Sequence, residues 1–141
     1  FNSLMAVPIS PRELKPWERI PLTWPGSAPE YAIYWAHEKL GLKEGIHYYY
    51  QSPFAGGRLF IGGAVIDFME IDVNVAIRVQ GLYFHAYAGG DRRALDHLQR
   101  IAIESQGITV VDITDEDALE SPIPVLRDAR SGIERPQPGR E

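Results

Sequence analysis

The chain of 141 residues contains no cysteine. This absence excludes a disulfide framework, a thiolate metal site and a cysteine nucleophile. A bound metal would need carboxylate, imidazole or carbonyl ligands, which favours magnesium or manganese over structural zinc. The chain also lacks an apolar run of membrane-spanning length, and its start lacks the pattern of a secretory signal. We therefore expect no membrane association, and a location in the cytoplasm or in a virion assembled inside a cell.

A basic excess is missing as well, since the formal net charge is -5. This balance disfavours a large non-specific nucleic-acid surface. The arginines nevertheless flank the central part of the chain, and a locally basic face with Arg58 and Arg78 on a substrate phosphate remains open. The hydrophobic content of 45% and the aromatic content of 11% predict one globular domain with a real core.

Prolines gather at both ends of the chain. Five of them fall in residues 1–25 without a sustained hydrophobic period, so residues 1–26 are predicted to form an extended arm. Residues 121–141 are predicted to form a second Pro-rich tail. Because tails of this composition are mobile unless something holds them, we expect both arms to lie against other protein chains, with an oligomer as one such arrangement.

A helix is predicted from Ser27 to Leu40. Ser27 suits the N-cap, Pro29 suits the first turn, and Glu30 stands at the third position, as in a capping box. Gly41 is a natural stop. Two interpretations of Glu30 stay open, which are a capping acid and a site carboxylate.

Residues 27–120 are predicted to form one α/β domain. The helix is followed by three strands, a second helix and a last strand, which implies a mixed central sheet flanked by helices. A short acidic helix then ends the domain. These elements are expected at residues 45–52, 64–66, 75–79, 91–106, 108–113 and 115–120.

The stretch from Gly62 to His85 is the most informative part of the sequence. Its two apolar runs predict an antiparallel hairpin, with Asp67 closing the first strand and a polar turn that contains Glu70, Asp72 and Asn74. Arg78 and Gln80 share one face of the second strand because side chains alternate. Burying the polar side chains of Asp67, Arg78 and Gln80 on a sheet costs free energy, so a row of this kind is expected where the side chains have a function.

The local patterns between residues 27 and 113 follow one another in a recognisable order. Pro-Glu opens a helix, Tyr-Gln lies in a strand, and a Gly-rich loop leads to Val-Ile-Asp-Phe. Ala-Ile-Arg-Val-Gln-Gly-Leu-Tyr-Phe-His follows, and Asp-x-x-x-Arg precedes Gly-Ile-Thr-Val-Val. This order resembles the restriction-endonuclease-like PD-(D/E)xK superfamily, and within it the very-short-patch repair endonucleases and related small domains of bacteria and phages.

The resemblance implies a metal-dependent DNA endonuclease. Asp67 and Glu30 would hold Mg²⁺ or Mn²⁺ together with the backbone carbonyl of Val79. Gln80 would orient the reacting groups, and His85 would activate the hydrolytic water. In this interpretation DNA is the partner and substrate.

Arg78 departs from the family pattern, because the common motif has an acid at this position. A guanidinium neither binds a metal cation nor acts as a base. Arg78 would either pair with Asp67 and fill the metal position, or bind the scissile phosphate. The first outcome predicts a catalytically inactive endonuclease-like fold that serves as a structural component of a larger assembly, such as a phage particle. The second predicts an active nuclease.

Overall fold

Four strands form one mixed sheet in the computed structural model, which describes residues 15–50, 66–80 and 90–136. The strands lie in the order β1-β2-β3-β4. The pairs β1/β2 and β2/β3 are antiparallel, whereas β3/β4 is parallel. Parallel neighbours need a long crossover, and helix α3 (Gly90–Glu104) lies between β3 and β4 in the chain. The strand bounds are Tyr48–Tyr50 for β1, Phe68–Glu70 for β2, Val75–Gln80 for β3 and Thr109–Thr114 for β4.

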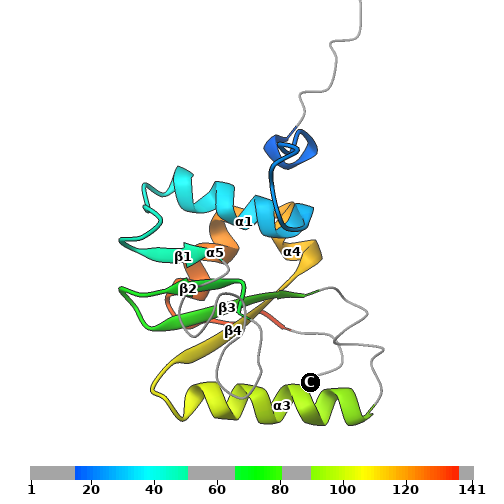
Figure 1. The fold of residues 1–141 in the computed structure, drawn as a ribbon, viewed down its shortest axis with the longest axis vertical. Coiled ribbons are helices and arrows are strands. Elements are labelled where there is room, and N and C mark those ends of the chain that lie inside the picture. Colours follow the sequence, from blue (N-terminus) through cyan, green and yellow to red (C-terminus); the bar gives the residue numbers. More distant parts are fainter. Residues whose placement is uncertain (1–14, 51–65, 81–89, 137–141) are drawn as a thin grey trace, which may run out of the picture.

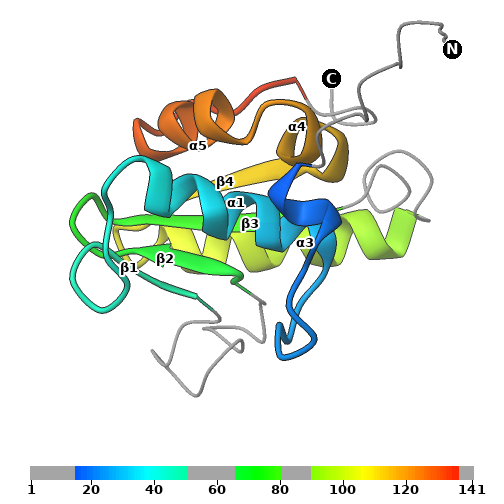
Figure 2. The ribbon, with the colours of Figure 1, turned by 90° about the horizontal axis from the view of Figure 1, so that it is seen from above.

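The sheet separates two helical layers (Figure 1). Helix α3 covers one face, while α1 (Ala28–Lys39), α4 (Asp115–Glu120) and α5 (Pro122–Arg130) cover the other. Figure 2 shows α1 and α5 side by side above the sheet. The predicted α/β class with a mixed sheet flanked by helices is therefore confirmed.

Helix α1 begins and ends where the sequence predicts. The Ser27 hydroxyl oxygen accepts a hydrogen bond from the Glu30 N–H at 3.3 Å, as expected of an N-cap. Gly41 follows the helix with a φ of 77°, a left-handed conformation that favours glycine. Ile33 and Ala36 lie one turn apart and are fully buried against the sheet.

The alternation of side chains in β3 and β4 divides the core into two clusters. Val75, Ile77 and Val79 pack with residues of α1, α4 and α5 on one face. On the other face, Ala76 packs with Ile103 of α3 and Val110 of β4. The predicted alternation in β3 is confirmed, and it places Arg78 on the face that α3 covers.

The first strand of the hairpin differs from the prediction. Strand β2 begins after Asp67, so Asp67 precedes this strand rather than closing one. Glu70 lies inside β2 and is fully buried, although the sequence analysis placed it in the polar turn. The turn itself spans residues 71–74, and Asn74 there has a φ of 56°. Residues 64 and 65 of the predicted strand lie outside the described part of the chain.

The boundary predicted at residue 121 is wrong. Pro122 occupies the first turn of α5, where a missing N–H is tolerated. Val125, Leu126 and Ala129 of α5 belong to the same core cluster as α1. The sequence analysis treated these prolines as the start of a tail, but a proline in the first helical turn is compatible with a packed helix.

The described part of the N-terminal arm also lies on the domain. A short 3-10 helix, η1, spans Pro16–Glu18. The ring of Trp17 meets that of Trp35 on α1 edge to face, with centroids 5.3 Å apart. No helix in the described ranges is long and apolar enough to cross a membrane.

Candidate functional site

Asp67 is held against the backbone of β3. Its N–H donates to the carbonyl oxygen of Ile77 at 3.0 Å, and its Oδ2 accepts from the N–H of Val79 at 2.8 Å. The residue is only 4% exposed. The predicted approach of Asp67 to the second strand of the hairpin is therefore confirmed, and the contact is a backbone hydrogen bond.

Val79 and Gln80 extend this site at the carboxyl end of β3. The N–H and C=O of one strand residue point toward the same neighbouring strand, so the carbonyl of Val79 lies on the side of β3 that faces Asp67. The Oε1 atom of Gln80 is buried and has no hydrogen-bond partner in the part of the chain that the structure describes. Such an atom is costly, because a buried acceptor has lost its water without replacement.

Glu30 lies at the same end of the sheet, on the face covered by α1. Its Oε1 accepts a hydrogen bond of 2.5 Å from the hydroxyl of Tyr50, and its Oε2 lies 3.2 Å from the hydroxyl oxygen of Ser27. Gly26 permits this approach, because a Cβ atom there would stand 2.0 Å from the Tyr50 hydroxyl. Glu30 thus belongs to the helix cap, and Tyr50 additionally ties it to β1.

A second acid lies near Glu30. Asp115 begins α4 directly after β4, at the end of the sheet where β3 also terminates. Burial raises the pKa of Asp115 above its ordinary value, and the charges of Glu116 and Glu30 raise it further. The negative charge of Glu30 therefore reaches Asp115.

The role predicted for Arg78 does not fit the structure. Its Nε and Nη2 donate to the two carboxylate oxygens of Asp112 at 2.6 and 2.8 Å, and its Nη1 pairs with Asp96 at 2.7 Å. Burial alone would lower the pKa of Arg78, but Asp112 and Asp96 raise it above its ordinary value. Arg78 is only 2% exposed, and its guanidinium links β3, β4 and α3 inside the core.

Neither alternative for Arg78 is therefore realised in the described chain. The guanidinium pairs with Asp112 and Asp96 rather than with Asp67, and its burial in the core keeps it from a phosphate. The parallel register that places Arg78 beside Asp112 decides this outcome. The sequence analysis missed Asp112 as the partner because the two residues are far apart in the chain.

The structure brings only some of the predicted site residues together. Asp67, Val79 and Gln80 are neighbours at the β2/β3 junction, whereas Glu30 lies on the opposite face of the sheet from the Gln80 side chain. No group of three or more His, Asp or Glu side chains suited to a metal ion occurs in residues 15–50, 66–80 and 90–136. His85 and Arg58 lie outside the described residues.

The ligands at Asp67 are nevertheless of the type that a hard divalent cation prefers. They comprise the carboxylate of Asp67, the backbone carbonyl of Val79 and the unpartnered amide oxygen of Gln80. Magnesium binds through one or two carboxylates and keeps several of its waters. By atom type alone, these oxygens suit magnesium or manganese.

A separate ionic cluster at the other end of the sheet has all its members paired. His37 is fully buried, its ring contacts those of Tyr48 and Phe68, and its Nε2 lies 2.9 Å from both oxygens of Glu70. Arg130 bonds to Glu70 and also to Asp72.

Comparison with known proteins adds no relative to this description. No family model, no curated protein and no solved structure matches the chain.

Proposed function

We propose that the chain is a metal-dependent endonuclease-like domain that hydrolyses phosphodiester bonds of DNA at Asp67. One observation carries the proposal: a buried carboxylate is fixed on the backbone of β3 beside Gln80, whose buried amide oxygen has no partner in the described chain. A buried polar atom without a partner among the described residues is a candidate for function.

The order of helices and strands along the chain supports the proposal. The resemblance implies a helix, three strands, a helix and a strand, and the chain has α1, β1, β2, β3, α3 and β4 in that order. It also implies that Asp67 and the carbonyl of Val79 bind one metal ion, and the hydrogen bond from the Val79 N–H to Asp67 Oδ2 supports their proximity.

Each residue of the site has a proposed role in hydrolysis. Asp67 and the carbonyl of Val79 would hold a magnesium or manganese ion, which supplies charge stabilisation at the scissile phosphate and a more acidic water. Gln80 would orient a water or phosphate oxygen through its amide. His85 remains the proposed base, on the strength of the resemblance alone. Arg78 acts indirectly, because it fixes the strand that carries Val79 and Gln80.

DNA nicking tests this function directly. Purified wild-type protein and Asp67→Asn are incubated with supercoiled, linear, mismatched and single-stranded DNA in the presence of magnesium or manganese. We expect cleavage by the wild type, inhibition by EDTA, and a loss of at least about 100-fold in Asp67→Asn. Asp72→Asn is the matched control, since this partly exposed acid lies at the other end of the sheet. No cleavage of any of these DNA forms by the wild type would refute the proposal.

A second candidate function is favoured by the Arg78 network. The position where the common motif has a second acid is occupied by a guanidinium that is fully engaged with Asp112 and Asp96. In this alternative the domain has lost its chemistry and serves as a component of a larger assembly, with its arms on neighbouring chains. An absence of cleavage together with self-association in sedimentation experiments would favour it. The first function belongs in the cytoplasm, and the second in a virion.

A further inference from the structure

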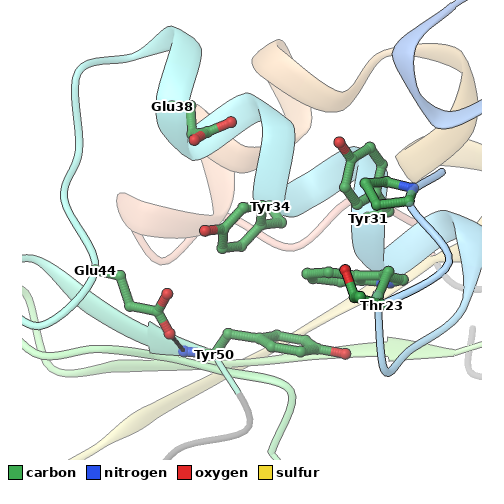
Figure 3. A pocket seen from close by; sticks show the side chains of 8 residues that line it. Thr23, Tyr31, Tyr34, Glu38, Glu44 and Tyr50 are labelled. Atoms are coloured by element: carbon green, nitrogen blue, oxygen red, sulfur yellow. Dashed lines mark hydrogen bonds between the residues drawn. The ribbon is translucent and has the colours of Figure 1, made fainter. Parts of the chain in front are cut away.

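An aromatic cavity of about 290 Å³ lies outside the site at Asp67 (Figure 3). Residues 21–24 form one wall, the outer side of α1 forms the second, and β1 with the segment before it forms the third. The cavity is lined by Pro21, Thr23, Trp24, Tyr31, Tyr34, Glu38, Glu44 and Tyr50.

Trp24 stands at the centre of the aromatic wall. Its ring stacks on Tyr50 with centroids 4.6 Å apart and an angle of 22°. It meets Tyr31 edge to face at 5.0 Å and Tyr34 at 5.1 Å. The indole N–H donates to the carbonyl oxygen of Ser27 at 3.1 Å, which fixes the orientation of the ring. Three ring contacts and one hydrogen bond thus hold Trp24 in place, and aromatic faces carry the negative part of their quadrupole.

The charged residues at this cavity are both acids. Glu38 and Glu44 are exposed, and the eight lining residues include no lysine, arginine or histidine. Figure 3 shows the hydroxyl of Tyr34 directed to the side where Glu38 and Glu44 stand. Burial raises the pKa of Tyr34, and the charges of Glu44 and Glu38 raise it further, so the negative field of both acids reaches the inside of the cavity.

We propose that this cavity binds the guanidinium group of an arginine side chain presented by a partner protein. A cation over aromatic faces with carboxylates at the rim is attracted by both. A guanidinium is planar and stacks on aromatic rings, and its five N–H donors match Glu38 and Glu44. A quaternary ammonium has no donor for these carboxylates, and a lysine ammonium is more strongly hydrated.

The two acids also select the source of the arginine. Free arginine carries its own carboxylate, which Glu38 and Glu44 would repel, whereas an arginine within a polypeptide carries none. The inference does not depend on chemistry at Asp67, because none of the lining residues belongs to the donor set there.

Peptide titration tests the proposal on the full chain. The probe is acetyl-Gly-Arg-Gly-amide, and binding is followed by tryptophan fluorescence and by the NMR shift of the Trp24 indole N–H. The citrulline and lysine versions of the peptide and free arginine serve as comparison ligands. The test variant is Glu38→Gln with Glu44→Gln. The control is Glu116→Gln with Glu120→Gln, which removes the same charge from exposed positions on α4.

We expect the arginine peptide to bind more tightly than the three other ligands. The Glu38/Glu44 double variant should bind it about tenfold more weakly, because charge-assisted hydrogen bonds are lost, while the control keeps the wild-type affinity. Equal binding of the citrulline or lysine peptide would overturn the assignment of a guanidinium. Tighter binding of free arginine would overturn the partner protein, and equal losses in both double variants would overturn the cavity as the site.

Discussion

The two ends of the central sheet differ in whether their buried polar groups have partners among the described residues. At the end with the 71–74 turn, Glu70 contacts His37 and Arg130, and Arg130 also contacts Asp72. At the end where β3 terminates, Gln80 keeps a buried amide oxygen without a partner in the described residues.

The difference distinguishes buried polar groups that hold the fold together from buried polar groups that are available to a ligand. The Nδ1 of His37 lies 2.8 Å from the carbonyl oxygen of Ile33, so this nitrogen donates. The other ring nitrogen, Nε2, faces both carboxylate oxygens of Glu70 at 2.9 Å. Each of the four side chains in this cluster, His37, Glu70, Asp72 and Arg130, contacts another member. At the other end, the buried amide oxygen of Gln80 has no partner among the described residues, and a ligand could supply that contact.

The largest expected effect is at the paired end. Glu70→Gln removes a buried charge shared by His37 and Arg130, so we expect a loss of about 3 kcal/mol in the free energy of unfolding. Urea denaturation measures it. Asp72→Asn is the control, because its pair with Arg130 is partly exposed and should contribute less than about 1 kcal/mol. Equal effects of the two substitutions would contradict the description of a buried cluster.

A smaller loss is expected from Tyr50→Phe. The substitution removes the hydroxyl that donates to Glu30 and leaves a buried carboxylate short of one partner. We expect a loss of about 2 kcal/mol in the same denaturation experiment. Tyr49→Phe is the matched control, since the neighbouring ring faces the other side of β1. A change of less than about 0.5 kcal/mol in Tyr50→Phe would show that Glu30 does not need this bond.

Gln80→Met should act in the opposite direction. It replaces the unpartnered amide by an apolar side chain of similar length, so we expect unchanged stability or a gain of about 1 kcal/mol. DNA cleavage should fall in the same variant. A stability loss above about 1 kcal/mol would mean that the amide has a structural task and would remove the contrast between the two ends.

The smallest effect is a pH dependence at Asp115. Its pKa is raised in the folded state, so the folded protein binds this proton more strongly than the unfolded chain does. Stability contributed by this group therefore falls as the pH rises through its titration. We expect Asp115→Asn to gain less than about 1 kcal/mol relative to the wild type between pH 3 and pH 7, measured by urea denaturation. A difference that does not change with pH would contradict the raised pKa.

Local signals in the sequence predicted much of the fold. The Ser27 cap, the Gly41 stop and the alternation in β3 depend on neighbouring residues, and all three are observed. The order of elements and the mixed sheet followed from them. The approach of Asp67 to β3 followed from the hairpin alone.

Partners distant in the chain were not predictable in the same way. Asp112 meets Arg78 only because β3 and β4 pair in parallel with one register, and no local pattern encodes that register. The prolines of α5 were misjudged, since their effect depends on whether they fall in a first helical turn. The aromatic cavity requires three separate segments, and the sequence showed only aromatic residues in each.

The segment after α5 has a consequence for association between copies of the chain. Strand β4 lies at one edge of the sheet, and the N–H of Asp112 on it donates to the Oε1 of Glu134 at 2.7 Å, while Arg100 holds the same carboxylate at 2.9 Å. An edge strand with open N–H groups is a template for another strand. Glu134 places a negative charge on this edge, and a strand of another chain would have to displace that charge in order to pair with β4. The carboxylate therefore disfavours edge-to-edge aggregation of the sheet.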